Sequence, residues 1–438
     1  MKKRFLALAL SFAMMGSVLA GCGSSQTSEE TTTTEAATTT EAAADTTEAT
    51  AADAQTVTDG NGETLTLVLR SGTYSDVIKQ CLPDFEQSHN VKCEVLELEE
   101  DDLHSKIALD SLNSDGAYDL CMVDGSWMAE FTSGGVLANL SEMGYSFDDD
   151  IIPATTAVSY YNDDIYLAPY YGNVTVLLYN KQNVEDAGYK AEDMQSLDDL
   201  LAVSKKAQEN GKKGFIYRGD SANNIVVDFL PILLSCGGWV IDDNNKPTVD
   251  TEEFRTALDY YMQLVATGDA EVKDDLIASI DNGSGTAAIG WPGWYNPTDD
   301  STGAYMALSG KQTADSEANN ANVYGIWTLG VTANSTHKEL TLELLEYLMD
   351  KDVQLSTVDN GGVPCRYSSL QNKDVLAKYP HYEVVCQALE SGKYRPLIEQ
   401  WTDFYTILGA EMDNILNGVK TVDEGLADAQ SQLDALME

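Results

Sequence analysis

DIYLAPYYGNVTVLLYNK, residues 164–181, contains two apolar stretches separated by a proline, two tyrosines and a glycine. Residues 165–168 and 174–179 are rich in β-branched and aromatic side chains, which predicts two extended segments. A chain that leaves one strand and enters another across such a break can pass from one globular lobe to a second. We therefore expect this stretch to be a crossing between two lobes, with Tyr170, Tyr171 and Asn173 facing the cleft between them.

The length and composition of the chain fit two lobes. It has 438 residues, of which 43% are apolar, enough for two hydrophobic cores. With 71 acidic and 26 basic residues the formal net charge is −45. Such a charge disfavours binding to nucleic acid and to other anionic partners.

The first 22 residues have the pattern of a bacterial lipoprotein signal sequence. Three basic residues precede an apolar run from Phe5 to Val18, and Leu-Ala-Gly-Cys follows, ending at Cys22. A signal anchor is the alternative, but the run is shorter than the roughly 20 residues that a membrane span needs. We expect residues 1–21 to be removed and Cys22 to be lipidated, with palmitate among its acyl chains, on the extracytoplasmic face of the membrane.

Residues 22–57 follow as a segment made almost wholly of Thr, Ser, Glu and Ala, with no basic residue. Because such a composition buries little apolar surface, we expect a disordered tether. The six later cysteines show no metal-binding spacing with the four histidines, so neither a metal nor a cofactor is expected. Buried thiols are the simpler interpretation, and Cys81 with Cys93 is the pair to examine if a disulfide exists.

The folded part begins with a strand–helix–strand pattern. Residues 65–69 predict a strand, residues 74–85 carry apolar side chains at helical spacing, and residues 91–95 alternate as a second strand. Residues 118–123 predict a further buried strand of a doubly wound α/β sheet. Residues just past the carboxyl ends of such strands line ligand crevices. This argument places Ser71, Tyr74, Asp124, Ser126 and Trp127 around one opening, although Trp127 could equally pack in the core.

No motif of a nucleophilic enzyme, a phosphate loop, a dinucleotide site or a metalloprotease is present. The positive signal is a set of aromatic residues near predicted breaks between elements. A flat ring can stack on the C–H face of a sugar, while polar neighbours bind its hydroxyl groups. Each ring alone is more often a core residue, but together they favour a pocket. The candidate ligand-binding residues are Tyr74, Asp124, Trp127, Tyr170, Tyr171, Asn173, Trp239, Trp291, Trp294, Arg366, Trp401 and Tyr405.

At these positions the chain resembles family 1 of the extracellular solute-binding proteins of ABC importers, the group that includes maltose-binding protein. Residues 165–181, ending in Leu-Leu-Tyr-Asn-Lys, look like the first interlobe crossing of that family. Trp239 after two glycines and Tyr405 in Trp-Thr-Asp-Phe-Tyr fall where sugar-contacting aromatics occur in maltose-binding protein. Trp291 or Trp294 corresponds to another such residue. Thr421 to Gln430 is similar to the family's C-terminal signature.

The resemblance implies an α/β protein with the type II periplasmic-binding-protein fold: two lobes of doubly wound sheets joined by crossing segments. We expect residues 58–171 and 329–362 to form lobe 1 and residues 172–328 and 363–438 to form lobe 2. The implied function is that of a monomeric, non-catalytic receptor. It would capture a mono- or oligosaccharide in the cleft and deliver it to an ABC permease.

Three alternatives stay open. A receptor for a cationic solute such as a polyamine would suit the acidic composition, and it predicts that carboxylates outnumber aromatic rings in the cleft. A cell-surface carbohydrate-active enzyme would use a pair of acids, which so acidic a chain cannot identify from sequence. A purely adhesive lipoprotein would bind no small solute. Ferric iron is disfavoured because Tyr260 and Tyr261 fall within a predicted helix.

Overall fold

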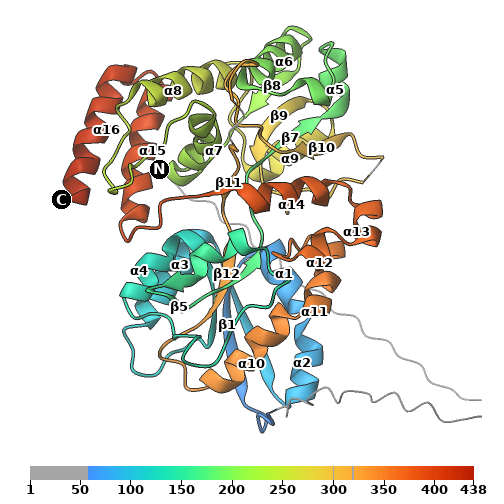
Figure 1. Ribbon diagram of the computed structural model, residues 1–438, viewed down its shortest axis with the longest axis vertical. Helices are drawn as coiled ribbons and strands as arrows, with labels where there is room; N and C mark the ends of the chain where they lie inside the picture. Colours follow the sequence, from blue (N-terminus) through green and yellow to red (C-terminus); the bar gives the residue numbers. More distant parts are fainter. Residues whose placement is uncertain (1–57, 299, 318–319) are drawn as a thin grey trace, which may run out of the picture. The chain divides into compact units, whose positions relative to one another are not determined.

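The computed structural model describes residues 58–298, 300–317 and 320–438. The predicted leader, Cys22 and the whole of the predicted tether lie outside these ranges. The described chain contains two larger β-sheets, each covered by helices (Figure 1). The α/β class and the two-lobed architecture that the sequence predicted are confirmed.

The sheet of the first lobe has the strand order β2-β1-β3-β12-β6. Strands β1, β2 and β3 are parallel, as the strand–helix–strand pattern predicted, while β12 is antiparallel to both β3 and β6. Its strands are β1 (Thr64–Arg70), β2 (Lys92–Leu98), β3 (Leu120–Asp124), β6 (Ala168–Tyr171) and β12 (Trp327–Val331). All five residues of β3 are buried, as expected for a strand with helices on both faces.

The sheet of the second lobe has the strand order β10-β7-β9-β8. Its strands are β7 (Val176–Asn180), β8 (Lys213–Ile216), β9 (Gly285–Gly290) and β10 (Gly303–Met306). Side chains of β7 alternate between two hydrophobic clusters, with Val176 and Leu178 in one and Leu177 and Tyr179 in the other. Both faces of this sheet are therefore covered, as doubly wound folds require.

Ten helices contribute side chains to the core cluster of the first sheet. They are α1 (Thr73–Lys79), α2 (Leu82–His89), α3 (Glu100–Asp110), α4 (Met128–Ser133), α9 (Lys273–Asp281), α10 (Lys338–Met349), α11 (Lys351–Thr357), α12 (Tyr367–Leu370), α13 (Lys373–Lys378) and α14 (His381–Ser391). Of these, α9 also packs on β7 and β9. The helix expected over residues 74–85 is divided in two, because Pro83 in the first turn of α2 cannot donate the hydrogen bond that would continue α1.

Six helices belong to the second core cluster. They are α5 (Lys181–Asp186), α6 (Leu197–Glu209), α7 (Ala222–Ser235), α8 (Glu252–Val265), α15 (Trp401–Leu416) and α16 (Val422–Met437). The two C-terminal helices lie beside α7 and α8 (Figure 1). A capping box is present at the start of α16, with Thr421 and Glu424 each accepting a hydrogen bond from the other's backbone N–H.

Residues 172–175 carry the chain from β6 in the first sheet to β7 in the second, so the predicted crossing is confirmed. The strand before it starts later than expected, at Ala168, and includes Pro169. Proline is tolerated there because β6 is an edge strand that pairs only with β12. Asp164–Ile165 instead forms β5, which pairs with β4 (Tyr160–Tyr161).

The chain passes between the sheets twice more, and the passages are hydrogen-bonded to one another. Strand β11 (Val323–Tyr324) lies on the return from β10 to β12 and pairs with β13 (Lys393–Tyr394), which follows α14. Val174 forms a bridge with Tyr324. The sequence predicted that lobe 2 resumes at residue 363, whereas the third passage reaches the core cluster of the second sheet at Ile398. The lobe boundaries stay a prediction.

The six cysteines after the tether are free thiols in the structure, and four of them are buried. Within the described ranges no helix combines the length and the apolar character needed to cross a membrane.

Candidate functional site

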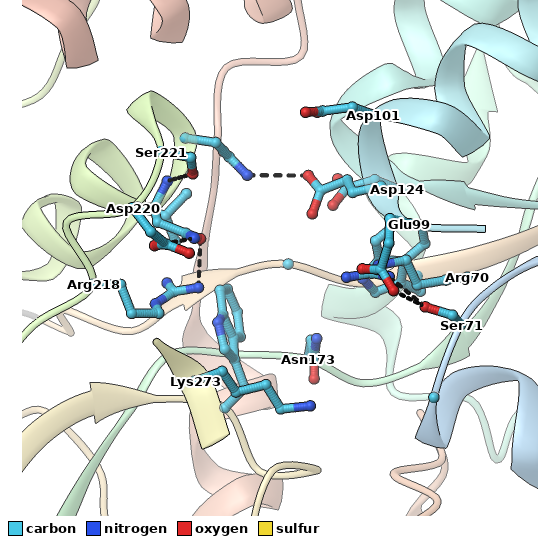
Figure 2. A pocket seen from close by; sticks show the side chains of 18 of the residues that line it. Arg70, Ser71, Glu99, Asp101, Asp124, Asn173, Arg218, Asp220, Ser221 and Lys273 are labelled. Carbon is cyan, nitrogen blue, oxygen red and sulfur yellow. Dashed lines mark hydrogen bonds and ion pairs between the residues drawn. The ribbon is translucent and has the colours of Figure 1, made fainter. Parts of the chain in front are cut away.

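A cavity of about 990 Å³ lies between the two sheets and takes side chains from both lobes and from the crossings (Figure 2). From the first lobe come the residues after β1 and β2, the start of α3 and the end of β3. The second lobe contributes the start of α7, the start of α9 and one face of α15. Residues at the carboxyl ends of parallel strands are those expected to bind ligands in open α/β sheets.

On the first lobe, the ends of β1 and β2 meet in an ion pair. The Arg70 guanidinium lies 2.6 Å from Glu99, and Ser71 Oγ donates a hydrogen bond to the same carboxylate. Hydrogen bonding by Ser71, together with Arg70, holds the pKa of Glu99 below its usual value. Figure 2 shows Arg70, Ser71 and Glu99 on the side of the cavity opposite Arg218 and Asp220.

Asp124, the last residue of β3, is held by a buried ion pair. Its Oδ1 accepts hydrogen bonds from Ser126 and from the Arg395 guanidinium, and both charged side chains are 5% exposed. Arg395 follows β13 and also donates from Nε to the Tyr324 carbonyl at 3.2 Å. Arg395, in the third passage between the lobes, therefore bonds both to the end of β3 in the first lobe and to Tyr324 in the second passage.

Glu100, the first residue of α3, joins the two lobes across the cavity. Its Oε1 accepts a hydrogen bond of 3.0 Å from Nδ2 of Asn223, which lies in the first turn of α7. Burial, reinforced by the negative charge of Asp124, raises the pKa of Glu100 to about 7. This carboxyl therefore titrates near neutral pH.

On the second lobe, Arg218 follows β8 and pairs with Asp228 of α7. The guanidinium bonds both oxygens of that carboxylate and donates to Asn224 Oδ1 at 2.6 Å. Its Cζ atom lies 5.0 Å from the centre of the Trp294 ring, within the range of a cation–π contact. The pair fixes the guanidinium against that indole at the edge of the cavity.

Five aromatic side chains line the cavity, two from the first lobe and three from the second. They are Tyr74, Trp327, Trp291, Trp294 and Tyr405. The Tyr74 and Trp327 rings pack with centroids 5.5 Å apart. Tyr74 Oη accepts a hydrogen bond of 2.8 Å from Nδ2 of Asn173, so the first crossing is bonded to the ligand-facing side of the first lobe.

Six of the twelve predicted ligand-binding residues line this cavity: Tyr74, Asp124, Asn173, Trp291, Trp294 and Tyr405. The other six do not. Trp127 is packed against Phe131 and Trp327, so of its two sequence interpretations the structure shows core packing. Tyr170 is buried within β6, and Tyr171 is buried with its hydroxyl donated to the Gly361 carbonyl.

The remaining three predicted residues are engaged elsewhere. Trp401 is buried against Phe404 in the second core. Trp239 packs at the edge of that core with the Lys393 ammonium 4.4 Å from its ring centre. Arg366 pairs with Asp148 and Asp150 beside a separate cavity of the first lobe. In the structure the two tryptophans pack in or at the edge of the second core, and the arginine neutralises two carboxylates.

Sequence reasoning missed several polar and aromatic residues of the cavity, namely Arg70, Glu99, Glu100, Arg218, Lys273, Trp327 and Arg395. The strand-end rule that found Asp124 applies equally to Arg70 and Glu99. Arg395 carries no local signal, because its partner Asp124 is 271 positions away. Among the described residues there is no group of three or more His, Cys, Asp or Glu side chains arranged to hold a metal ion.

Two α/β lobes joined by several crossings, with a ligand-sized cavity between them, define a solute-binding receptor. Residues 68–355 match the family model for bacterial extracellular solute-binding proteins. The chain belongs to this family.

Relatives and solved structures agree in fold. A probable amino-acid ABC transporter periplasmic-binding protein of Sinorhizobium fredii is 20% identical over 395 residues, 86% of this chain and 90% of that protein. An arabinooligosaccharide-binding protein of Halalkalibacterium halodurans is 22% identical over 265 residues, 56% of this chain and 58% of that protein. The maltose-bound MalE3 of T. maritima superposes with a TM-score of 0.77 at 22% identity, covering 86% of this chain and all of that one. A ribitol-bound solute-binding protein of Agrobacterium radiobacter K84 gives 0.77 at 21% identity, covering 87% and 100%.

Proposed function

We propose that this chain captures a mono- or oligosaccharide in the cleft between its lobes and delivers it to an ABC permease, without catalysis. The observation that carries the proposal is the lining of the cavity: aromatic rings on both lobes beside hydrogen-bonding side chains. Rings such as Trp294 and Tyr405 can stack on sugar C–H faces, and side chains such as Asn173 can bind hydroxyl groups. The solved relatives were crystallised with maltose and ribitol, which supports this class of ligand.

Delivery would follow from closure of the lobes. In the described part of the chain, hydrogen-bonded passages connect the two sheets, a construction that suits hinge motion. A ligand that touches both lobes has a higher affinity for the closed form and shifts the equilibrium toward it. The closed form would then be what the permease recognises. We expect the receptor to act as a monomer.

A receptor for a cationic solute is the second candidate. Such a receptor was predicted to have more carboxylates than aromatic rings in the cleft, and the cavity meets this condition. Seven carboxylates line the cavity against five aromatic rings. Four cationic side chains share the cavity, so the formal net charge of its lining is −3. The relative in Sinorhizobium fredii is a probable amino-acid ABC transporter periplasmic-binding protein, and an amino acid, like a polyamine, carries an ammonium group.

The test of sugar binding is a thermal-unfolding and calorimetric screen of residues 57–438 against neutral sugars, amino sugars, polyamines and amino acids. A ligand at 100 times its dissociation constant should add about 2.7 kcal/mol to the stability of the folded form. A selective shift with saccharides is the expected result. A shift with polyamines alone would favour the second candidate, and turnover of a glycan would make the chain an enzyme.

The aromatic rings give a sharper prediction. Trp294→Ala and Tyr405→Ala should each weaken saccharide binding by about 1 to 3 kcal/mol, because each removes a ring that faces the cavity. Trp239→Ala is the matched control, since Trp239 lies outside the cavity lining and its loss should leave affinity unchanged. Calorimetric titration measures all three. Full affinity in folded Trp294→Ala and Tyr405→Ala variants would exclude stacking on these rings.

We also propose that Cys22 carries the lipid anchor and that residues 22–57 tether the receptor to the extracytoplasmic face of the membrane. The support is the leader sequence, since these positions lie outside the described residues. Cys22→Ser should abolish incorporation of labelled palmitate and release the chain from the membrane fraction. Deletion of residues 23–56 should leave ligand affinity intact. Retention of Cys22→Ser in the membrane would point to an uncleaved anchor.

A further inference from the structure

Two residues that line the cavity each have a buried side-chain oxygen without a hydrogen-bond partner among the described residues. Oδ1 of Asn173 and Oδ1 of Asn223 are both buried, and neither has a hydrogen-bond partner within the described residues. Asn173 as a whole is only 3% exposed, and its Nδ2 is already donated to Tyr74. The Nδ2 of Asn223 is donated to Glu100. Since buried acceptors without donors are costly, a ligand that fits this cavity must supply donors.

The charges of the cavity are unevenly compensated. Asp124 is paired with Arg395 and Glu99 with Arg70, while the Arg218 guanidinium is occupied by Asp228. Glu100 has no ion pair in the described part of the chain, and its bond to Asn223 is to a neutral amide. A half-buried carboxylate without a cation is the arrangement that a positively charged ligand group would satisfy.

Among the described residues, Lys273 is the cation of the cavity without an ion pair, but it does not fill this role. Desolvation lowers the pKa of Lys273, and the charged groups that act on it are Asp274, Arg70, Glu99 and Arg218. The corresponding charged groups around Glu100 are Asp124, Arg395, Arg70 and Asp101. Lys273 is not among the charged groups that act on Glu100, and Figure 2 shows Lys273 well separated from Asp101, the residue after Glu100.

We propose that the ligand is a saccharide with a free amino group, whose ammonium binds between Glu100 and Asn223. This inference rests on the proposed function and narrows its substrate class. An ammonium supplies three donors and one positive charge. One donor bonds the Glu100 carboxylate, and a second reaches the adjacent Asn223 Oδ1. The sugar hydroxyl groups donate to Asn173 Oδ1 while the ring lies against the aromatic side chains.

The test compares matched ligands that differ only in acetylation of the amine. Glucosamine and its β-1,4-linked di-, tri- and tetramers are titrated calorimetrically at pH 7 beside their N-acetylated counterparts, with spermidine as an amine without a sugar ring. We expect the free amines to bind about tenfold more tightly than the acetylated forms. Glu100→Gln keeps the size of the side chain and one acceptor oxygen but removes the charge, and should abolish this preference. Glu209→Gln, which removes the charge of a carboxylate outside the cavity lining, should keep it.

Equal affinity for the two forms, or a preference for the acetylated form, would overturn the amino-sugar assignment while leaving a saccharide receptor in place. A preference that persists in Glu100→Gln would overturn the assignment of the ammonium to this residue. Binding of spermidine without any saccharide would overturn both the inference and the proposed function. Unfolding midpoints of both variants, measured without ligand, establish that each is folded before titration.

Discussion

Arg218→Met is expected to destabilise the folded chain by about 3 to 5 kcal/mol, the usual cost of removing one partner of a buried ion pair. Asp228 is 1% exposed on its side chain, and its carboxylate is compensated in the structure by Arg218. Methionine has a similar length but no charge, so it leaves a carboxylate buried without a cation. Urea unfolding followed by circular dichroism gives the change in midpoint.

Two further variants separate the charge effect from a loss of packing. Arg218→Met combined with Asp228→Leu should recover much of the stability, because replacing a whole buried pair by apolar side chains is often neutral. Lys206→Ala breaks the exposed pair with Glu209 and should cost well under about 1 kcal/mol. The defect of the single Arg218→Met variant should also shrink at low pH, where protonation neutralises Asp228. A single variant as stable as the wild type would contradict the assigned role of the pair.

The fold could be predicted from the sequence because its signals are local. The break around Pro169 and Gly172 marks the first crossing, and the strand–helix–strand pattern of residues 64–98 marks the parallel sheet. The predicted boundaries of helices and strands were wrong where tertiary contacts determine them. Strand β6 extends through Pro169 only because it lies at the edge of its sheet, which no local pattern reveals.

The candidate site was predictable only in part, for a different reason. Asp124 was found because it ends a buried strand, and Trp291 and Trp294 because a Pro-Gly pair separates them. Trp401 satisfied the same aromatic criterion and is buried in the core. An aromatic ring near a break has two uses, packing and ligand contact, and the choice depends on which helix face meets the cleft. Pairs such as Asp124 with Arg395 depend on chain segments brought together only by the fold.

The pH dependence of amine binding is the second large expected effect, and it follows from Glu100. Burial raises the pKa of its carboxyl to about 7, so below pH 7 the carboxyl is mostly neutral and cannot pair with an ammonium. Affinity for glucosamine oligomers should therefore rise by roughly tenfold between pH 5 and pH 6 and level off only above pH 7. At higher pH it should fall again, as the free amine of the ligand loses its proton.

Several charged or titratable groups surround Glu100. A variant is therefore needed to assign the rise of affinity below pH 7, called here the acid limb of the pH profile, to Glu100 itself. The surrounding groups are Asp101 on its own helix, Asp124 and Arg395, Arg70, Tyr74 and Tyr405. The hydroxyls of Tyr74 and Tyr405 titrate far above this range, because burial raises their pKa values. Glu100→Gln should remove the acid limb and leave the alkaline limb, which belongs to the ligand. An identical acid limb with the N-acetylated oligomers would mean that the titration does not report a bond to the ammonium, since those ligands carry no charge.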